Sequence, residues 1–213
     1  MKMKKNDNKR LMESGMMIAL AAILSMLKLF QLPYGGAVTV VSMLPMLLLS
    51  YRYGMRWGSL ACFAYSLVQL LQGVGEGSLK GLSLGAFLGS AALDYLLAFT
   101  VLCLGGALKG KMKGDAAAFG VGTVLACLAR YVCHILSGFL FFGDYAEWFF
   151  LETGFPGGEE ITSLFTGKLL VLLYSVIYNA TFMIPELIIT TAAAVLVARV
   201  ASHFLTGELV RVE

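Results

Sequence analysis

The sequence has few of the charged residues with which soluble domains face water. Only 14% of its 213 residues are Asp, Glu, Lys or Arg, whereas soluble domains carry about 25%. Its 4 prolines are too few for a disordered or collagen-like chain. Hydrophobic residues make up 59% of the chain, and this excess of apolar side chains needs lipid as its solvent. The composition therefore predicts an integral membrane protein that crosses the bilayer several times.

Motifs of metal centres and hydrolytic enzymes are also missing from the sequence. It contains no H-E-x-x-H motif, with which zinc peptidases hold their metal. The cysteines form no C-x-x-C pair and fall in apolar stretches, so we expect buried or lipid-facing side chains rather than a metal site or disulfides. They are Cys62, Cys103, Cys127 and Cys133. We predict no metal site and no nucleic-acid partner.

Charged residues and Gly/Pro turns divide the chain into apolar segments, and a membrane-spanning helix needs about 20 largely apolar residues. After a basic tail at 1–10, the predicted helices cover about 11–32, 37–51, 57–73, 82–108, 116–142 and 168–200. The second of these is short, and the last is long enough to tilt or to kink at Pro185. We therefore predict an all-α membrane protein with six transmembrane helices in a single domain, 1–213.

The distribution of charge predicts the orientation of these helices. Basic residues collect in the N-terminal tail, in two alternate connections and near the C-terminus: Lys2, Lys4, Lys5, Lys9, Arg10, Arg52, Arg56, Lys109, Lys111, Lys113, Arg199 and Arg211. The opposite connections are acidic: Glu76, Asp144, Glu147, Glu152, Glu159 and Glu160. Because cytoplasmic loops carry the excess of Lys and Arg, we expect both termini in the cytoplasm and the segment 143–167 outside.

Polar side chains inside apolar helices are costly, so each is expected to have a partner or a function. The predicted helices carry Asp94 and Tyr95 on the fourth, Arg130, His134, Ser137 and Gly138 on the fifth, and Tyr174, Ser175, Tyr178, Asn179 and Glu186 on the sixth. At about 1.5 Å of rise per residue, Asp94, His134, Tyr174 and Asn179 lie at similar depths in the outer half of the membrane. We predict that they line one cavity open to the outside.

This set of residue types suits a flat ligand. A carboxylate in a dry aromatic pocket favours ring-nitrogen donors or a fixed positive charge, and Phe142, Tyr145 and Trp148 are expected at the outer rim. Gly138 lies one helical turn from His134, and we expect its missing side chain to leave room for the ligand.

Structural roles for the same residues remain open. Arg130 lies at about the depth of Asp94, so the two form a candidate ion pair, and Glu186 is another candidate partner for Arg130. Tyr174 and Asn179 are also typical of hydrogen bonds between helices. An intramembrane enzyme would need a second carboxylate facing Asp94, or a serine beside His134.

A further feature is the first predicted helix, where small residues recur four apart at Gly15 and Ala19, and again at Ala21 and Ser25. This spacing allows the close approach of another helix, from the same protein or from a partner.

Several of these segments together resemble the S components of energy-coupling factor (ECF) vitamin transporters, and most closely the thiamine-specific family. The resemblance covers about residues 15–196. It rests on the small-residue face of the first helix, SMLPMLLLSYRYG (42–54), ALDYLLAF (92–99), ARYVCHILSGFLFFGDYA (129–146) and YSVIYN (174–179).

The resemblance implies a six-helix vitamin-binding protein of the bacterial plasma membrane that is not an enzyme and has no cofactor of its own. It implies docking, through Gly15 and Ala19, on a membrane-embedded coupling subunit driven by two ATP-binding cassette subunits, which alone use ATP. The substrate-binding residues it implies are Asp94, Tyr95, His134, Gly138, Phe142, Tyr174 and Asn179. Tyr34, Gly35 and Gly36 would form the gate over the site.

The sequence departs from the thiamine-specific pattern at three residues and in an expanded loop at 143–167. The family has tryptophans where Gly36 and Phe142 stand here, and its binding carboxylate is Glu where this chain has Asp94. Phe142 still offers an aromatic face for stacking, whereas Gly36 offers none. Thiamine is the expected ligand, with a related pyrimidine or another small vitamin as the alternative.

Overall fold

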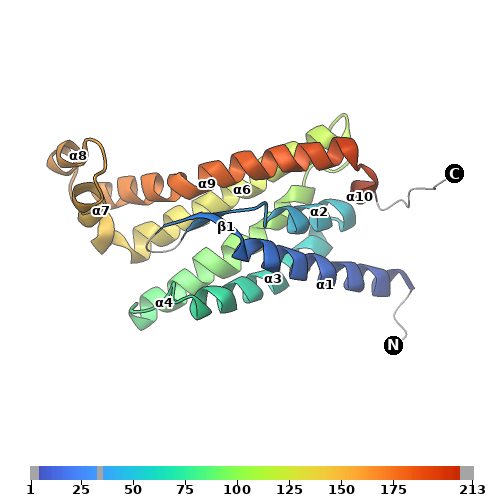
Figure 1. Ribbon diagram of the computed structural model, residues 1–213, viewed down its shortest axis with the longest axis horizontal. Coiled ribbons are helices and arrows are strands. Elements are labelled where there is room, and N and C mark those ends of the chain that lie inside the picture. The colour runs from blue at the N-terminus through green and yellow to red at the C-terminus, as the bar shows by residue number, and fades with distance from the viewer. Residues whose placement is uncertain (1–4, 33–35, 207–213) are drawn as a thin grey trace.

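The structure, a computed structural model, describes residues 5–32 and 36–206 as an elongated bundle of helices (Figure 1). The long helices run roughly along its length. The start of α1 (Lys5–Met26) and the short α10 (His203–Thr206) lie at one end. The opposite end carries α4 (Leu84–Ser90), α7 (Ala146–Glu152) and α8 (Gly158–Leu164).

A β-hairpin interrupts the first part of the bundle. Strand β1 (Lys28–Gln31) pairs antiparallel with β2 (Ala37–Thr39), so that Lys28 lies opposite Thr39. The expectation of a helix over 11–32 is therefore corrected, since α1 ends at Met26. Pro33 disfavours helical backbone at the residue before it, and the run Val38–Val41 is rich in the β-branched residues that favour strands.

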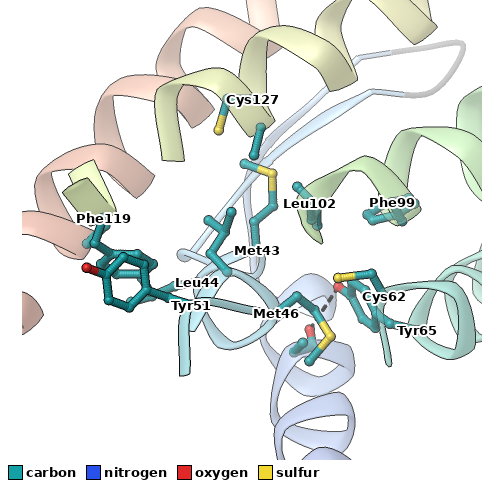
Figure 2. Packing of buried hydrophobic residues seen from close by; sticks show 14 of the residues in the cluster. Met43, Leu44, Met46, Tyr51, Cys62, Tyr65, Phe99, Leu102, Phe119 and Cys127 are labelled. Atoms are coloured by element: carbon teal, nitrogen blue, oxygen red, sulfur yellow. Dashed lines mark hydrogen bonds between the residues drawn. The ribbon is translucent and has the colours of Figure 1, made fainter. Parts of the chain in front are cut away.

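The predicted helix at 37–51 is corrected as well. After β2 the chain forms only the ten-residue α2 (Leu44–Tyr53), which is too short to cross a membrane. This helix lies in the centre of the bundle, where Met43, Met46 and Tyr51 are almost fully buried (Figure 2). The ring of Tyr51 meets that of Phe119 edge-on, with their centroids 5.1 Å apart. The second segment is therefore part of the hydrophobic core.

The other predicted helices agree with the structure to within a few residues. α3 covers Met55–Gly75, α6 covers Asp115–Phe141 and α9 covers Gly167–Val200. The predicted helix at 82–108 is a continuous rod of α4, the π-helix η1 (Ala91–Leu97), α5 (Ala98–Thr100) and the 3₁₀-helix η2 (Val101–Gly106). Among the described residues, three helices are long and apolar enough to span a membrane: 84–106, α6 and α9.

Helices α6 and α9 pack side by side along the bundle (Figure 1). Beyond α6, the segment 143–167 folds into η3 (Gly143–Tyr145), α7 and α8. Its aromatic side chains pack onto the start of α9, with the ring of Phe149 5.5 Å from that of Tyr174 and 5.6 Å from that of Tyr178. This cluster fixes the two tyrosines of α9 at the end of the bundle that is opposite to α10.

Candidate functional site

A cavity of about 170 Å³ lies between the hairpin, α3, η1, α6 and α9. All seven predicted substrate-binding residues line it, although they come from three separate helical segments: Asp94, Tyr95, His134, Gly138, Phe142, Tyr174 and Asn179. Of the predicted gate, Gly36 also lines the cavity, whereas Tyr34 and Gly35 lie outside the described residues. The structure thus brings the predicted set together, and its contact with a ligand stays a prediction.

Asp94 lies in the π-helix and is the centre of a polar cluster. Ser90, one turn earlier, donates a hydrogen bond of 2.6 Å to its Oδ2, and Ser137 of α6 donates to the same oxygen. His134 Nδ1 lies 2.8 Å from Oδ1. A π-helical turn widens the helix and is frequent at functional sites. Here the π-helical turn places the Asp94 carboxylate against α6, where it is joined to His134 by a hydrogen bond.

His134 is 8% exposed, and its second ring nitrogen is free to receive a donor. Because a carboxylate only accepts hydrogen bonds, Nδ1 carries the proton in the pair with Asp94, and Nε2 of a neutral ring is an acceptor. Within 5–32 and 36–206, Nε2 is buried and has no hydrogen-bond partner. The ring also meets Phe182 edge-on, with centroids 5.5 Å apart. The pair therefore offers an acceptor nitrogen beside an aromatic surface.

Gly138 allows α6 and α9 to approach closely. A Cβ on this residue would lie 2.8 Å from Ser175 Oγ and 3.3 Å from Asn179 Nδ2. The expectation that its missing side chain leaves room for a ligand is corrected, because α9 fills that space. Asn179 Nδ2 donates to the backbone oxygens of Ser175 and His134, at 2.8 and 3.3 Å. The glycine thus serves the site through helix packing that fixes His134 and Asn179 relative to each other.

Gly36 is crowded by an aromatic ring from α9. Its φ of +81° lies in the region that favours glycine, and a Cβ there would be 2.6 Å from Phe182 Cδ1. Phe182 lines the cavity and was not predicted as a site residue. Gly36 offers no aromatic face, as the sequence analysis expected, and the structure places the ring of Phe182 against it.

Arg130 lines the cavity without forming either of the ion pairs considered from the sequence. Its guanidinium lies 4.3 Å from the centre of the Phe99 ring, and its NH1 group donates to Met43 Sδ at 2.9 Å. Across the described ranges, no carboxylate oxygen lies within 4.0 Å of it. Asp94 is therefore held by hydroxyls and an imidazole, and Arg130 is a separate charge in the cavity wall.

The hairpin and α3 contribute polar residues that the sequence analysis missed. Lys28 and Glu76 form an ion pair of 2.5 Å at the edge of the cavity. Gln69 and Gln72 of α3 also line it, and Gln69 Nε2 donates to Ser25 Oγ at 2.9 Å. These glutamines lie in an apolar helix, so the rule that identified Asp94 and His134 would have identified them too.

Glu186 also lines the cavity, although the sequence analysis considered it only as a partner for Arg130. It is 2% exposed and lies two turns beyond Asn179 on α9. Its Oε1 accepts hydrogen bonds from both the backbone N–H and the hydroxyl of Thr39 in β2. A carboxylate at the inner part of the cavity therefore anchors the hairpin to α9.

The first helix presents the small residues predicted for docking. Gly15 and Ala19 are exposed, and a Cβ on Gly15 would meet nothing within 4 Å. Ala21 and Ser25, on another face of α1, are buried. The two small-residue faces thus differ: one packs inside this chain and the other stays open.

Comparisons with known proteins agree with this architecture. Residues 11–148 match the family described as thiamine transporter protein. Thiamine transporter ThiT of Bacillus subtilis is 30% identical over 93% of this chain and 95% of its own length. Thiamine transporter ThiT of Lacticaseibacillus paracasei is 25% identical over 82% of this chain and 86% of its own.

A solved structure of ThiT from Listeria monocytogenes has the same fold. It superposes with a TM-score of 0.70 at 18% identity and covers 95% of this chain and 100% of that one. Family match, relatives and fold lead to one conclusion: the chain belongs to the thiamine transporter family, whose members are membrane transport proteins rather than a class of enzymes.

Proposed function

We propose that this protein binds thiamine in the cavity between the hairpin, η1, α6 and α9, as the substrate-binding subunit of an ECF-type importer. The observation that carries the proposal is the Asp94–His134 pair in the wall of that cavity. Thiamine joins an aminopyrimidine ring to a positively charged thiazolium ring. Asp94 and His134 Nε2 supply acceptors for the amine, while Tyr174, Phe142 and Phe182 supply aromatic surfaces for the rings.

Direct binding tests this proposal. We expect the purified protein to bind one thiamine per chain in isothermal titration calorimetry, and native mass spectrometry to show the same complex. His134→Ala removes the acceptor and the edge-on ring, so the affinity for thiamine should fall by at least about tenfold, since unsatisfied buried partners cost about 1–3 kcal/mol. Tight binding of another small vitamin, with none of thiamine, would replace the proposed ligand; unchanged affinity in His134→Ala would refute the site.

We also propose six crossings of the bacterial plasma membrane, with both termini in the cytoplasm. Five helical rods (α1, α3, 84–106, α6 and α9) each account for one crossing, and β2 with α2 makes the remaining one. The non-helical part of that crossing is β2, and non-helical backbone is tolerated at membrane depth where protein surrounds it. Both β2 and α2 contain mostly buried residues. The connection between α2 and α3 and the connection at 109–113 lie at the same end of the bundle as α10, away from acidic α8 (Figure 1). Single-cysteine labelling from each side tests this topology.

The proposed partners are a membrane-embedded coupling subunit and two ATP-binding cassette subunits, which alone use ATP. Support comes from the open small-residue face of α1, where Gly15 and Ala19 are exposed. The double variant Gly15→Leu/Ala19→Leu should not copurify with the coupling subunit, while its thiamine affinity should be unchanged. The matched control is Ala192→Leu, on an exposed site of α9. Equal copurification of both variants would refute this docking surface.

A further inference from the structure

Glu186 is a buried carboxylate with half of its hydrogen-bonding capacity unused. Its side chain is 2% exposed, and Oε1 is occupied by the two donors of Thr39. Oε2 is buried and has no partner in the part of the chain that the structure describes. A buried carboxylate is strongly unfavourable unless a charge or several donors compensate it. The residue also lines the cavity, so a molecule bound there is placed to supply the compensation.

The balance of charge in the cavity wall favours a cation. Of the described lining residues, the carboxylates are Glu76, Asp94 and Glu186, and the permanently charged bases are Lys28 and Arg130. With His134 counted as neutral, the sum is one negative charge. Glu76 is neutralised by Lys28 at 2.5 Å, and Asp94 already accepts hydrogen bonds from Ser90 and Ser137. Glu186 is therefore the carboxylate of this wall with the most capacity left for a positive group.

Its position separates it from the Asp94–His134 pair. Asn179, which binds the His134 carbonyl oxygen, precedes Glu186 by seven residues, or roughly 10 Å of helical rise. A ligand of two linked rings can therefore place one ring at Asp94 and direct the other toward Glu186.

We propose that Glu186 recognises the fixed positive charge of the ligand while its other oxygen holds strand β2. The same carboxylate would then select a positively charged ligand and hold the hairpin that forms a wall of the cavity. This inference rests on the proposed binding of thiamine, and assigns its thiazolium ring to the Glu186 end and its aminopyrimidine ring to Asp94.

The test uses thiamine and 3-deazathiamine, a neutral isostere in which carbon replaces the thiazolium nitrogen. Both affinities are measured by calorimetry on the full-length protein. We expect the wild type to bind thiamine roughly ten- to hundredfold more tightly than the isostere. This ratio corresponds to the free energy that an interaction with a charged group contributes. Glu186→Gln keeps the shape and an acceptor for Thr39, so this preference should fall to about threefold or less, because only thiamine binds more weakly.

Two further variants separate charge recognition from structural effects. Thr39→Val removes a hydroxyl donor but no charge, and Asp94→Asn affects the ring that both ligands share, so each should weaken both ligands by a similar factor. If Glu186→Gln does not yield folded protein, Glu186→Asp replaces it; the retracted charge should weaken thiamine more than the isostere.

The outcomes distinguish this inference from the proposed function. If the wild type binds neither ligand, the proposed function fails and the inference fails with it. If the wild type binds thiamine but Glu186→Gln retains the full preference over the isostere, the inference alone is overturned. The inference is also overturned, and the proposed function kept, if Asp94→Asn rather than Glu186→Gln abolishes the preference.

Discussion

The hydrogen bonds to Asp94 allow the effect of its removal to be predicted in some detail. Its carboxylate accepts from Ser90, Ser137 and His134, whose side chains are all at least nine-tenths buried. Asp94→Ala leaves these donors without an acceptor, at about 1–3 kcal/mol each. The unliganded protein should therefore lose about 3 kcal/mol or more of stability, a fall of roughly 6 °C or more in melting temperature.

Substitutions that remove different numbers of these hydrogen bonds test the predicted loss of stability. Asp94→Asn keeps one acceptor oxygen and loses the charge, so its cost should lie between that of Asp94→Ala and the roughly 1 kcal/mol expected for Ser137→Ala. Thiamine affinity, measured by calorimetry, should fall in the same order. A melting temperature and affinity of Asp94→Ala within error of the wild type would show that the cluster neither stabilises the fold nor binds the ligand.

Three other predictions concern glycine packing and surface charge. Gly36→Ala should lower the melting temperature and the thiamine affinity more than Gly77→Ala, because both have positive φ (+81° and +79°) but only the first is crowded; equal losses would contradict this. Gly138→Ala should cost about 1–3 kcal/mol by overpacking against Ser175, and Ser175→Ala in the same chain should restore part of it in thermal unfolding. Lys28→Ala breaks a partly exposed ion pair and should cost about 1 kcal/mol or less; a larger loss in the same assay would show that the pair is structurally essential.

The part of the site that sequence reasoning identified depends on a rule that needs no tertiary structure. A polar group in an apolar helix must find a partner or a ligand, so Asp94, His134 and Asn179 stand out without any knowledge of their contacts. Apolar segments bounded by charged residues and Gly/Pro turns located α6 and α9 within a residue or two. The same rule applied to Gln69 would have extended the site to α3, whereas Glu186 was found by the rule but was considered only as a partner for Arg130.

Hydropathy alone does not predict the hairpin, and the reason is physical. The apolar stretch from Leu11 to Leu32 has the length of a membrane helix, and a hydropathy pattern carries no sign that a segment at this depth will be surrounded by protein. Non-helical backbone is tolerable there only where protein surrounds it. In β2, Val38 and Thr39 are buried, whereas Leu29 and Phe30 of β1 are exposed. The strand at 37–39 thus follows both from the β-branched residues at 38–41 and from the packing of β2 against α9.

The non-helical backbone of the hairpin also has a chemical consequence for the cavity. In the interior of a helix each backbone N–H is bonded to the carbonyl four residues earlier, whereas a hairpin leaves outward-facing N–H groups unpaired. The Thr39 N–H is such a group, and it donates to Glu186 together with the Thr39 hydroxyl. A helix through residue 39 would offer no spare backbone donor, and the buried Glu186 would be left with fewer partners. The strand and the buried carboxylate therefore depend on each other, and a sequence in which either one changes is expected to require a compensating change in the other.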